Sequence, residues 1–221
     1  MIYLSSQAPA PLIEYLAKKD SLTLTGPWPG VDPAIACHAD LVYCRLGAGA
    51  SAPVFAGAPS LLGSPYPKDC RFNAVIAGPY VICRPDVTDP KLMAAAEEYI
   101  RKTYRKEPAL ISVKQGYTRC SLAVIDENHV ITADRGIAKA LQLQKGPECL
   151  LVRPGYVQLS GYQYGFLGGT CGRVGSEIVF SGDLSAHPDF SAICCLIRSC
   201  GLTPVWFEGL PLTDIGSIIS T

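Results

Sequence analysis

The stretch SLAVIDENHVITAD (residues 121–134) decides the fold, because its pattern occurs three times in the chain. A short β-rich run leads through the turn DEN into a second one, which is typical of a β-hairpin. The stretches NAVIAGPYVICRPD (73–86) and TCGRVGSEIVFSGD (170–183) have the same length, a turn at the same place and the same final aspartate. The strongest signal in the sequence is therefore an internal repeat.

The sequence after each hairpin changes its hydrophobic period from two to about 3.6, which predicts a helix. These helices are expected over residues 89–104, 135–144 and 189–200. Gly or Pro ends each helix, and third strands are expected over 109–114, 148–153 and 203–208. We assign Asp86, Asp134 and Asp183 to capping of these helices, because a cap is needed at every helix start. The repeating unit is thus ββαβ.

The flanking sequence supplies two further units. Residues 9–19 read as a helix opened by proline, and a strand is expected over 21–26. A hairpin over 39–57 is followed only by the loop APSLLGSPYPKDC (58–70), so this unit is truncated. The ends of the chain, IYLSS and GSIIST, supply the missing hairpin of the first helix if they lie side by side. Closing a ring in this way leaves no exposed sheet edge.

We therefore predict an α/β fold with pseudo-fivefold symmetry, a five-bladed α/β propeller of ββαβ units closed by the two termini. The whole chain, 1–221, forms a single domain on this interpretation. Its units are expected over 215–221 together with 1–26, and over 38–70, 71–114, 119–153 and 165–208.

The composition narrows the classes of function. The chain has 19 basic and 19 acidic side chains, whereas general nucleic-acid binders usually carry a basic excess. No apolar run reaches the ~18–20 residues that span a bilayer, and the start MIYLSSQAPAP does not read as a signal peptide. We expect a cytoplasmic protein without membrane association, with its ten cysteines reduced and mostly buried. No CxxC pair or metal-type histidine spacing occurs, so we expect no metal and no cofactor.

Five such units resemble the pentein fold, the α/β propeller of guanidino-modifying enzymes such as dimethylargininase, arginine deiminase, agmatine deiminase and the amidinotransferases. The same fold also serves a non-enzymatic ribosome anti-association initiation factor. The stretch CRFNAVIAGPYVICRPDVTDPK (70–91) resembles the dimethylargininase hairpin that runs into a helix, and residues 176–218 resemble its last unit. The sequence is also similar to an uncharacterised bacterial family of about this length, described only by that fold. The resemblance covers nearly the whole chain.

The resemblance implies a particular chemistry for the enzymes of the fold. A cysteine thiolate attacks the guanidinium carbon, a histidine moves protons, and carboxylates bind the guanidinium. In this chain Asp40 resembles the guanidinium-binding aspartate, but the neutral Asn73 takes the place of the next carboxylate. Gly116 or Gln115 stands where the histidine is expected, and Ser220 where the cysteine is expected. The resemblance therefore implies that the hydrolase machinery is lost, with Ser220 a weak substitute.

Other residues near the expected ring centre are candidates for ligand binding. Cys120 lies beside Arg119 and close to Lys114, and nearby cations make a thiol more reactive by lowering its pKa. A cysteine that opens a strand can equally be a packed side chain. Gly168 and Gly169 either let backbone N–H groups approach an anion or let strands crowd around a narrow channel.

Two acidic residues and one histidine also have alternative interpretations. Asp40 either binds a ligand or caps the start of a strand, and Asp214 is either a second carboxylate for a cation or a turn residue. His187 is expected to cap its helix locally or to lie on the surface.

Two hypotheses follow. In the first, the protein is no longer an enzyme and binds a small polar or guanidino-like ligand, or a protein partner, at the ring centre. In the second, it is a hydrolase or transferase that acts on amidine or guanidino compounds with a rearranged site, for instance Cys120 with Asp40 and His38.

Overall fold

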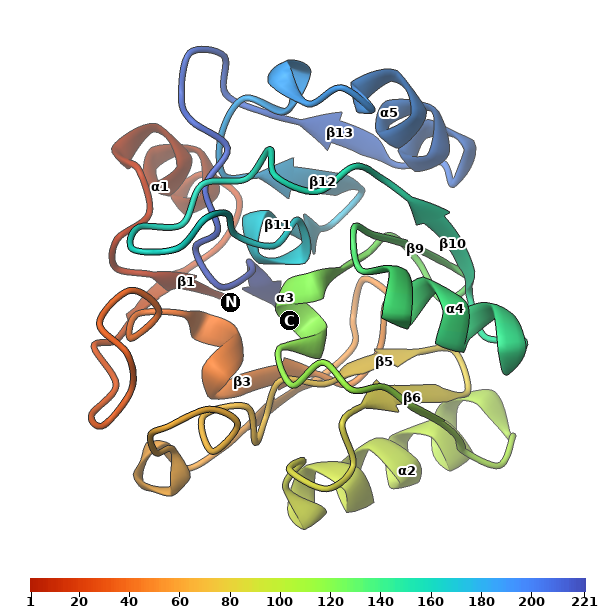
Figure 1. Cartoon of the computed structure of the whole chain (residues 1–221). Coiled ribbons are helices and arrows are strands. Elements are labelled where there is room, and N and C mark those ends of the chain that lie inside the picture. Colours follow the sequence, from red (N-terminus) through yellow and green to blue (C-terminus); the bar gives the residue numbers. More distant parts are fainter.

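The three predicted repeats form hairpins, helices and third strands at the expected places (Figure 1). The computed structural model describes all residues from 1 to 221. The first repeat consists of β5 (Val75–Ala77), β6 (Tyr80–Cys83), α2 (Pro90–Tyr104) and β7 (Ala109–Ser112). The second consists of β8 (Leu122–Val124), β9 (His129–Thr132), α4 (Arg135–Leu143) and β10 (Glu148–Leu151). The third consists of β11 (Cys171–Val174), β12 (Glu177–Phe180), α5 (Phe190–Ser199) and β13 (Thr203–Val205).

The two hairpin strands of each repeat are antiparallel, and the third strand runs parallel to the second. In the first repeat Val75 pairs with Ile82 across the hairpin, and Tyr80 pairs with Ala109. The helix connects the two parallel strands, since parallel neighbours need a long crossover. The prediction of three ββαβ units is confirmed.

The two flanking units also have the predicted form. The truncated one is a two-stranded sheet of β3 (Tyr43–Arg45) and β4 (Val54–Ala56), and no α-helix follows it before β5. The other joins the two ends of the chain, because β14 (Ile219–Ser220) pairs antiparallel with β1 (Ile2–Ser5). Its remaining elements are α1 (Ala10–Ala17) and β2 (Leu22–Thr25), and β2 is parallel to β1.

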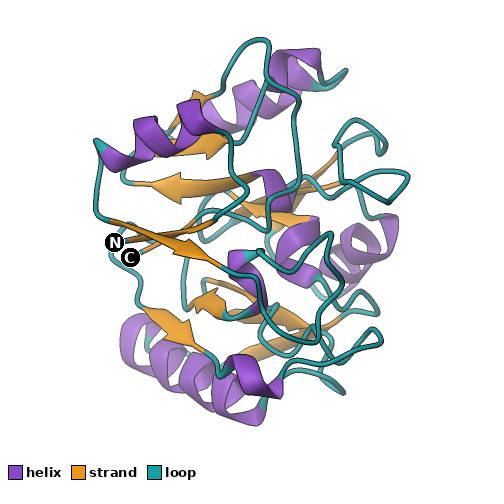
Figure 2. Ribbon diagram, turned by 90° about the vertical axis from the view of Figure 1, so that its left-hand side faces the viewer, coloured by secondary structure: helices purple, strands orange, loops and turns teal.

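The fold is thus mixed α/β with five small sheets, and their first strands contact one another in sequence. β14 contacts β3, β3 contacts β5, β5 contacts β8, β8 contacts β11, and β11 contacts β14. In Figure 1 the helices α1, α2, α4 and α5 lie at the outer edge, while the one-turn helix α3 (Thr118–Ser121) lies near the middle. Figure 2 shows both chain ends on one side of the molecule and many of the connecting loops on the other.

The helices are held by apolar faces that pack onto the sheets. In α2 the buried residues Leu92, Ala96 and Ile100 recur every four positions, which puts them on one helix face. They pack in one cluster with Val81 and Cys83 of β6. All ten cysteines are free and seven of them are buried, as small apolar side chains would be. None of the helices combines the length and the apolar character needed to cross a membrane.

The helix caps agree with the predictions only in part. Asp134 caps α4, and its side chain accepts hydrogen bonds from two backbone N–H groups. The prediction for Asp86 is wrong: Asp89 caps α2, because Pro90 fits the first position of the helix and makes the residue before it the cap. Asp86 instead pairs with Arg84. Asp183 caps a short 3₁₀ turn (Leu184–Ala186) that precedes α5, and not α5 itself.

Candidate functional site

A pocket of about 250 Å³ brings together three chemically active side chains. They are His38, Cys120 and Asp214, and all three are buried. Their imidazole nitrogen, thiol sulfur and carboxylate oxygen lie within 4.8 Å of one another. Aromatic side chains also line this pocket, namely Tyr66, Tyr117, Tyr162, Tyr164 and Phe166. The pocket therefore combines polar groups with extensive aromatic surface.

Three separate parts of the chain supply these polar groups. His38 directly precedes the 3₁₀ turn η1 (Ala39–Leu41), which leads into β3. Cys120 lies in α3, the single helical turn in front of β8. Asp214 lies in the loop that leads to β14. Each group is thus positioned just before the first strand of a sheet, where the five sheets approach one another.

Asp40 lies behind Cys120, away from the pocket wall. The Cys120 thiol donates a hydrogen bond to Asp40 Oδ2 at 2.9 Å, and the Ser217 hydroxyl donates to the same oxygen at 2.6 Å. The other carboxylate oxygen, Asp40 Oδ1, is buried without a hydrogen-bond partner. Asp40 therefore contacts the thiol directly and can accept its proton.

Asn73 positions the turn that carries Cys120. Its side-chain oxygen accepts from Arg119 N at 2.6 Å and from Cys120 N at 3.3 Å. Its amide nitrogen donates to Asp40 O at 3.1 Å. This set of bonds needs a donor and an acceptor on one side chain, which an ionised aspartate cannot provide. The position of Asn73 thus explains why a neutral residue stands there.

Burial controls the protonation of the site. Burial raises the pKa of Asp214 to about 6 and raises the pKa of Asp40 as well. Burial and the neighbouring charge of Asp40 raise the pKa of the Cys120 thiol well above its usual value. Burial lowers the pKa of His38. At neutral pH the site thus holds a thiol, an uncharged imidazole and a mostly ionised Asp214.

Comparison with known proteins places the chain in a family. The sequence model of the Family of unknown function (DUF6873) matches residues 51–219. The chain belongs to this family. The DUF6873 match includes Cys120 and Asp214 but begins after His38 and Asp40. Searches of the curated proteins and of the solved structures found no match.

The expectation that the cations of Arg119 and Lys114 lower the pKa of the Cys120 thiol is wrong. The Arg119 guanidinium donates to Leu122 O at 2.7 Å and lines a different cavity. Lys114 is exposed and does not line the pocket. Adjacent residues of a helical turn point in different directions, so closeness in sequence did not place the Arg119 charge beside the sulfur.

Ser220 does not lie at the site. Its hydroxyl donates to Arg173 O, and its side chain is absent from the pocket wall. The serine that reaches Asp40 is Ser217, which directly follows Gly216. Ser217 is not among the site residues expected from the sequence, although its place just after this glycine was a usable signal. The aromatic wall was also missed, because no pattern marks loop residues that converge from different units.

Gly168 and Gly169 allow neighbouring parts of the chain to pack closely against them. A Cβ at Gly169 would lie 1.9 Å from Asp214 Oδ1, and one at Gly168 would lie 2.5 Å from Arg119 O. Neither glycine lines the pocket. The crowding interpretation therefore accounts for both. Asp214 itself is held by hydrogen bonds from Phe166 N at 2.9 Å and Gly216 N at 3.1 Å.

Two clusters of side chains offer ligand atoms of the kinds that bind metal ions. His38, Cys120 and Asp214 offer nitrogen, sulfur and oxygen ligands of the kind that Zn²⁺ binds. Such binding would require the Cys120 thiol to lose the proton that it donates to Asp40. The second group consists of Asp126, His129 and Cys200. His187 is buried, not on the surface, and its Nδ1 accepts a hydrogen bond from Asp189 N, whereas Asp189 is the cap residue of α5.

Proposed function

We propose that this DUF6873 chain is a pentein-like α/β propeller of one domain whose central pocket binds a small organic cation, an amidine or guanidino compound. The cyclic contacts between the first strands of the five sheets support the architecture. The resemblance of the hairpin and helix segments to dimethylargininase supports the ligand class.

The observation that carries the proposal is the placement of Asp214 beside aromatic rings in a pocket of about 250 Å³. Asp214 Oδ1 lies 3.9 Å from His38 Nδ1, but burial lowers the pKa of this imidazole and leaves it uncharged at neutral pH, so a cation bound next to Asp214 would supply the missing positive charge. Aromatic faces attract cations as well, most strongly where water is excluded. A planar amidinium can also donate paired hydrogen bonds to a carboxylate.

The test is a thermal-shift titration of the whole protein with amidine and guanidino compounds and with their neutral urea counterparts. At a hundredfold excess over Kd, a cation should stabilise the protein by about 2.7 kcal/mol. This corresponds to a rise in Tm of about 5–11 °C for a chain of this size. Asp214→Asn should abolish the rise, whereas Glu98→Gln, an exposed change on α2, should preserve it. Equal stabilisation by urea compounds, or none by any cation, would refute the proposal.

A second candidate function is catalysis with Cys120 as the nucleophile. The specific observation in its favour is the hydrogen bond from the thiol to Asp40 Oδ2, which provides a route for the proton. A cation bound at Asp214 would favour the thiolate, because an opposite charge lowers the pKa of a thiol. Reactivity would then depend on the bound substrate.

An electrophilic amidine, 2-chloroacetamidine, tests this candidate against the neutral reagent 2-chloroacetamide. The Cys120 sulfur would form a bond to the methylene carbon, chloride would leave, and Asp40 would accept the thiol proton. Mass spectrometry should find one adduct on Cys120, formed much faster with the amidine, and absent in Cys120→Ser. Cys195→Ser, which removes the exposed thiol, is the matched control. Equal rates with both reagents would argue against a cation-directed nucleophile.

A further inference from the structure

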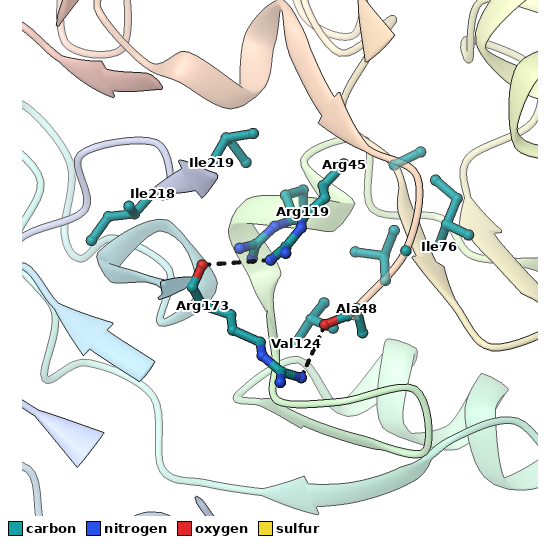
Figure 3. Close-up of a pocket in the computed structure, with 11 residues that line it drawn as sticks. Arg45, Ala48, Ile76, Arg119, Val124, Arg173, Ile218 and Ile219 are labelled. Atoms are coloured by element: carbon teal, nitrogen blue, oxygen red, sulfur yellow. Dashed lines mark hydrogen bonds between the residues drawn. The ribbon is translucent and has the colours of Figure 1, made fainter. Parts of the chain in front are cut away.

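Three arginines line a second cavity in the middle of the molecule, and the function proposed above does not use it (Figure 3). Arg45 lies in β3, Arg119 in α3 and Arg173 in β11, so each comes from a different unit. The other residues that line the cavity are glycine, alanine, valine and isoleucine. The cavity thus has three positive charges and otherwise apolar walls.

No carboxylate balances these charges. The ion pairs of the structure include none of the three arginines. Their guanidinium groups donate to uncharged main-chain carbonyl oxygens, the closest of them at 2.7–3.3 Å. These closest acceptors are Gly49 and Ala50 for Arg45, Leu122 and Cys171 for Arg119, and Ala48 and Gly175 for Arg173.

Some of the donors are still free. Arg45 Nε is buried and has no hydrogen-bond partner. The hydrogen bonds of Arg173 use its Nε and Nη1 atoms, so Nη2 stays available. A buried donor without a partner is costly and calls for an explanation such as a ligand.

The like charges also repel one another. Burial, together with the charges of Arg173 and Arg119, lowers the pKa of Arg45 to about 10. Apolar walls keep the local dielectric low, which strengthens this repulsion and would equally strengthen attraction to an anion. An anion would therefore relieve the repulsion and satisfy the free donors together.

We propose that the cavity lined by Arg45, Arg119 and Arg173 binds a small inorganic oxyanion, such as phosphate or sulfate. The cavity volume of about 20 Å³ holds one water-sized group, so one oxygen of the anion enters it and the others stay at the mouth. The planar fork of arginine matches the oxygens of such an anion. The site is independent of the Cys120 pocket, which takes a ligand of the opposite charge.

The experiment is a phosphate titration of the whole protein at constant ionic strength, followed by isothermal calorimetry and by Tm, with chloride in a parallel arm. Wild-type protein should bind one phosphate or sulfate per chain, with a saturable rise in Tm that chloride does not produce. Arg173→Gln should weaken binding about tenfold or more, because a charged donor is lost. Arg101→Gln, on the exposed face of α2, should leave binding unchanged.

The Tm without added anion separates binding from a structural role. Relief of repulsion predicts that Arg173→Gln has an unchanged or higher Tm in the absence of phosphate. A purely structural arginine would instead lower this Tm and leave the phosphate effect intact, which would overturn the proposal. If Arg173→Gln fails to fold, Arg45→Lys keeps the charge, removes the fork and should still weaken binding. Equal effects of chloride and phosphate, or no binding by the wild-type protein, would also overturn it.

Discussion

Asp214 should make the stability of the protein fall as the pH rises, and Asp214→Asn should remove this dependence. Burial raises the pKa of this carboxyl from 3.8 to about 6. Between these values the folded protein holds a proton that the unfolded chain has released, so stability decreases with pH across this window. Above it the full cost of burying the charge is present.

The magnitude follows from the two pKa values. A rise from 3.8 to about 6 corresponds to about 3 kcal/mol of unfolding free energy, lost between about pH 4 and pH 7. For a chain of this size the difference amounts to about 6–12 °C in Tm. The amide introduced by Asp214→Asn would still accept one of the two backbone hydrogen bonds, and the cost of losing the other does not vary with pH. The pH dependence is therefore the informative quantity.

The assay is urea denaturation followed by the fluorescence of Trp28 and Trp206, at several pH values from 4.5 to 7.5. Asp40 also has a raised pKa, caused mainly by its burial and least by the charge of Asp214, so the difference between the curves reports Asp214 together with a smaller change at Asp40. Asp183→Asn is a control, because hydrogen bonds from Ser185 lower the pKa of Asp183 below 3.8, so this carboxyl is ionised in the folded and the unfolded protein across the assay range and its removal should leave the slope with pH unchanged. Parallel curves for wild-type protein and Asp214→Asn would refute the reasoning.

Three further experiments test the fold. Asp134→Ala should cost about 1 kcal/mol in urea denaturation because α4 loses its cap, whereas Asp86→Ala should stay within about 0.5 kcal/mol. Gly172→Ala places a Cβ 1.9 Å from Ile218 O, which pushes β11 away from β14 and should lower the free energy of unfolding by about 1–3 kcal/mol. The control Gly49→Ala has room for its Cβ and should leave the free energy of unfolding unchanged. In a thiol titration of the folded protein, Cys195 should react first, and early reaction of the buried cysteines would contradict the burial described above.

The sequence predicted the elements well, because each repeat combines a period-two hairpin with a period-3.6 helix and turn residues between them. The pairing of β1 with β14 was also predictable, since the first unit otherwise had a helix and no hairpin. The cap of α2 was mistaken because a repeated aspartate outweighed the stronger local signal of Pro90. The architecture as a closed propeller stays a proposal.

The candidate site was predictable only as a set of residues, not as a geometry. Asp40, Cys120 and His38 were named together from the sequence, and the structure places them together. The direction of each side chain was not predictable, because Arg119 and Cys120 are neighbours that line different cavities. Whether Ser217 or Ser220 reaches the site depends on where β14 begins. The sequence of the short irregular loop before β14 does not show this starting point.

The pairing of β1 with β14 also determines when the protein can finish folding during its synthesis. β1 is made before β14, so β1 keeps an unpaired edge until residues 219–220 have left the ribosome. A free strand edge is a template for pairing with other chains. Closing the longest loop of the chain is also the slowest kind of contact to form. Chains that stop before residue 219 should therefore aggregate more readily than chains that include β14, even though four of the five sheets lack no strand.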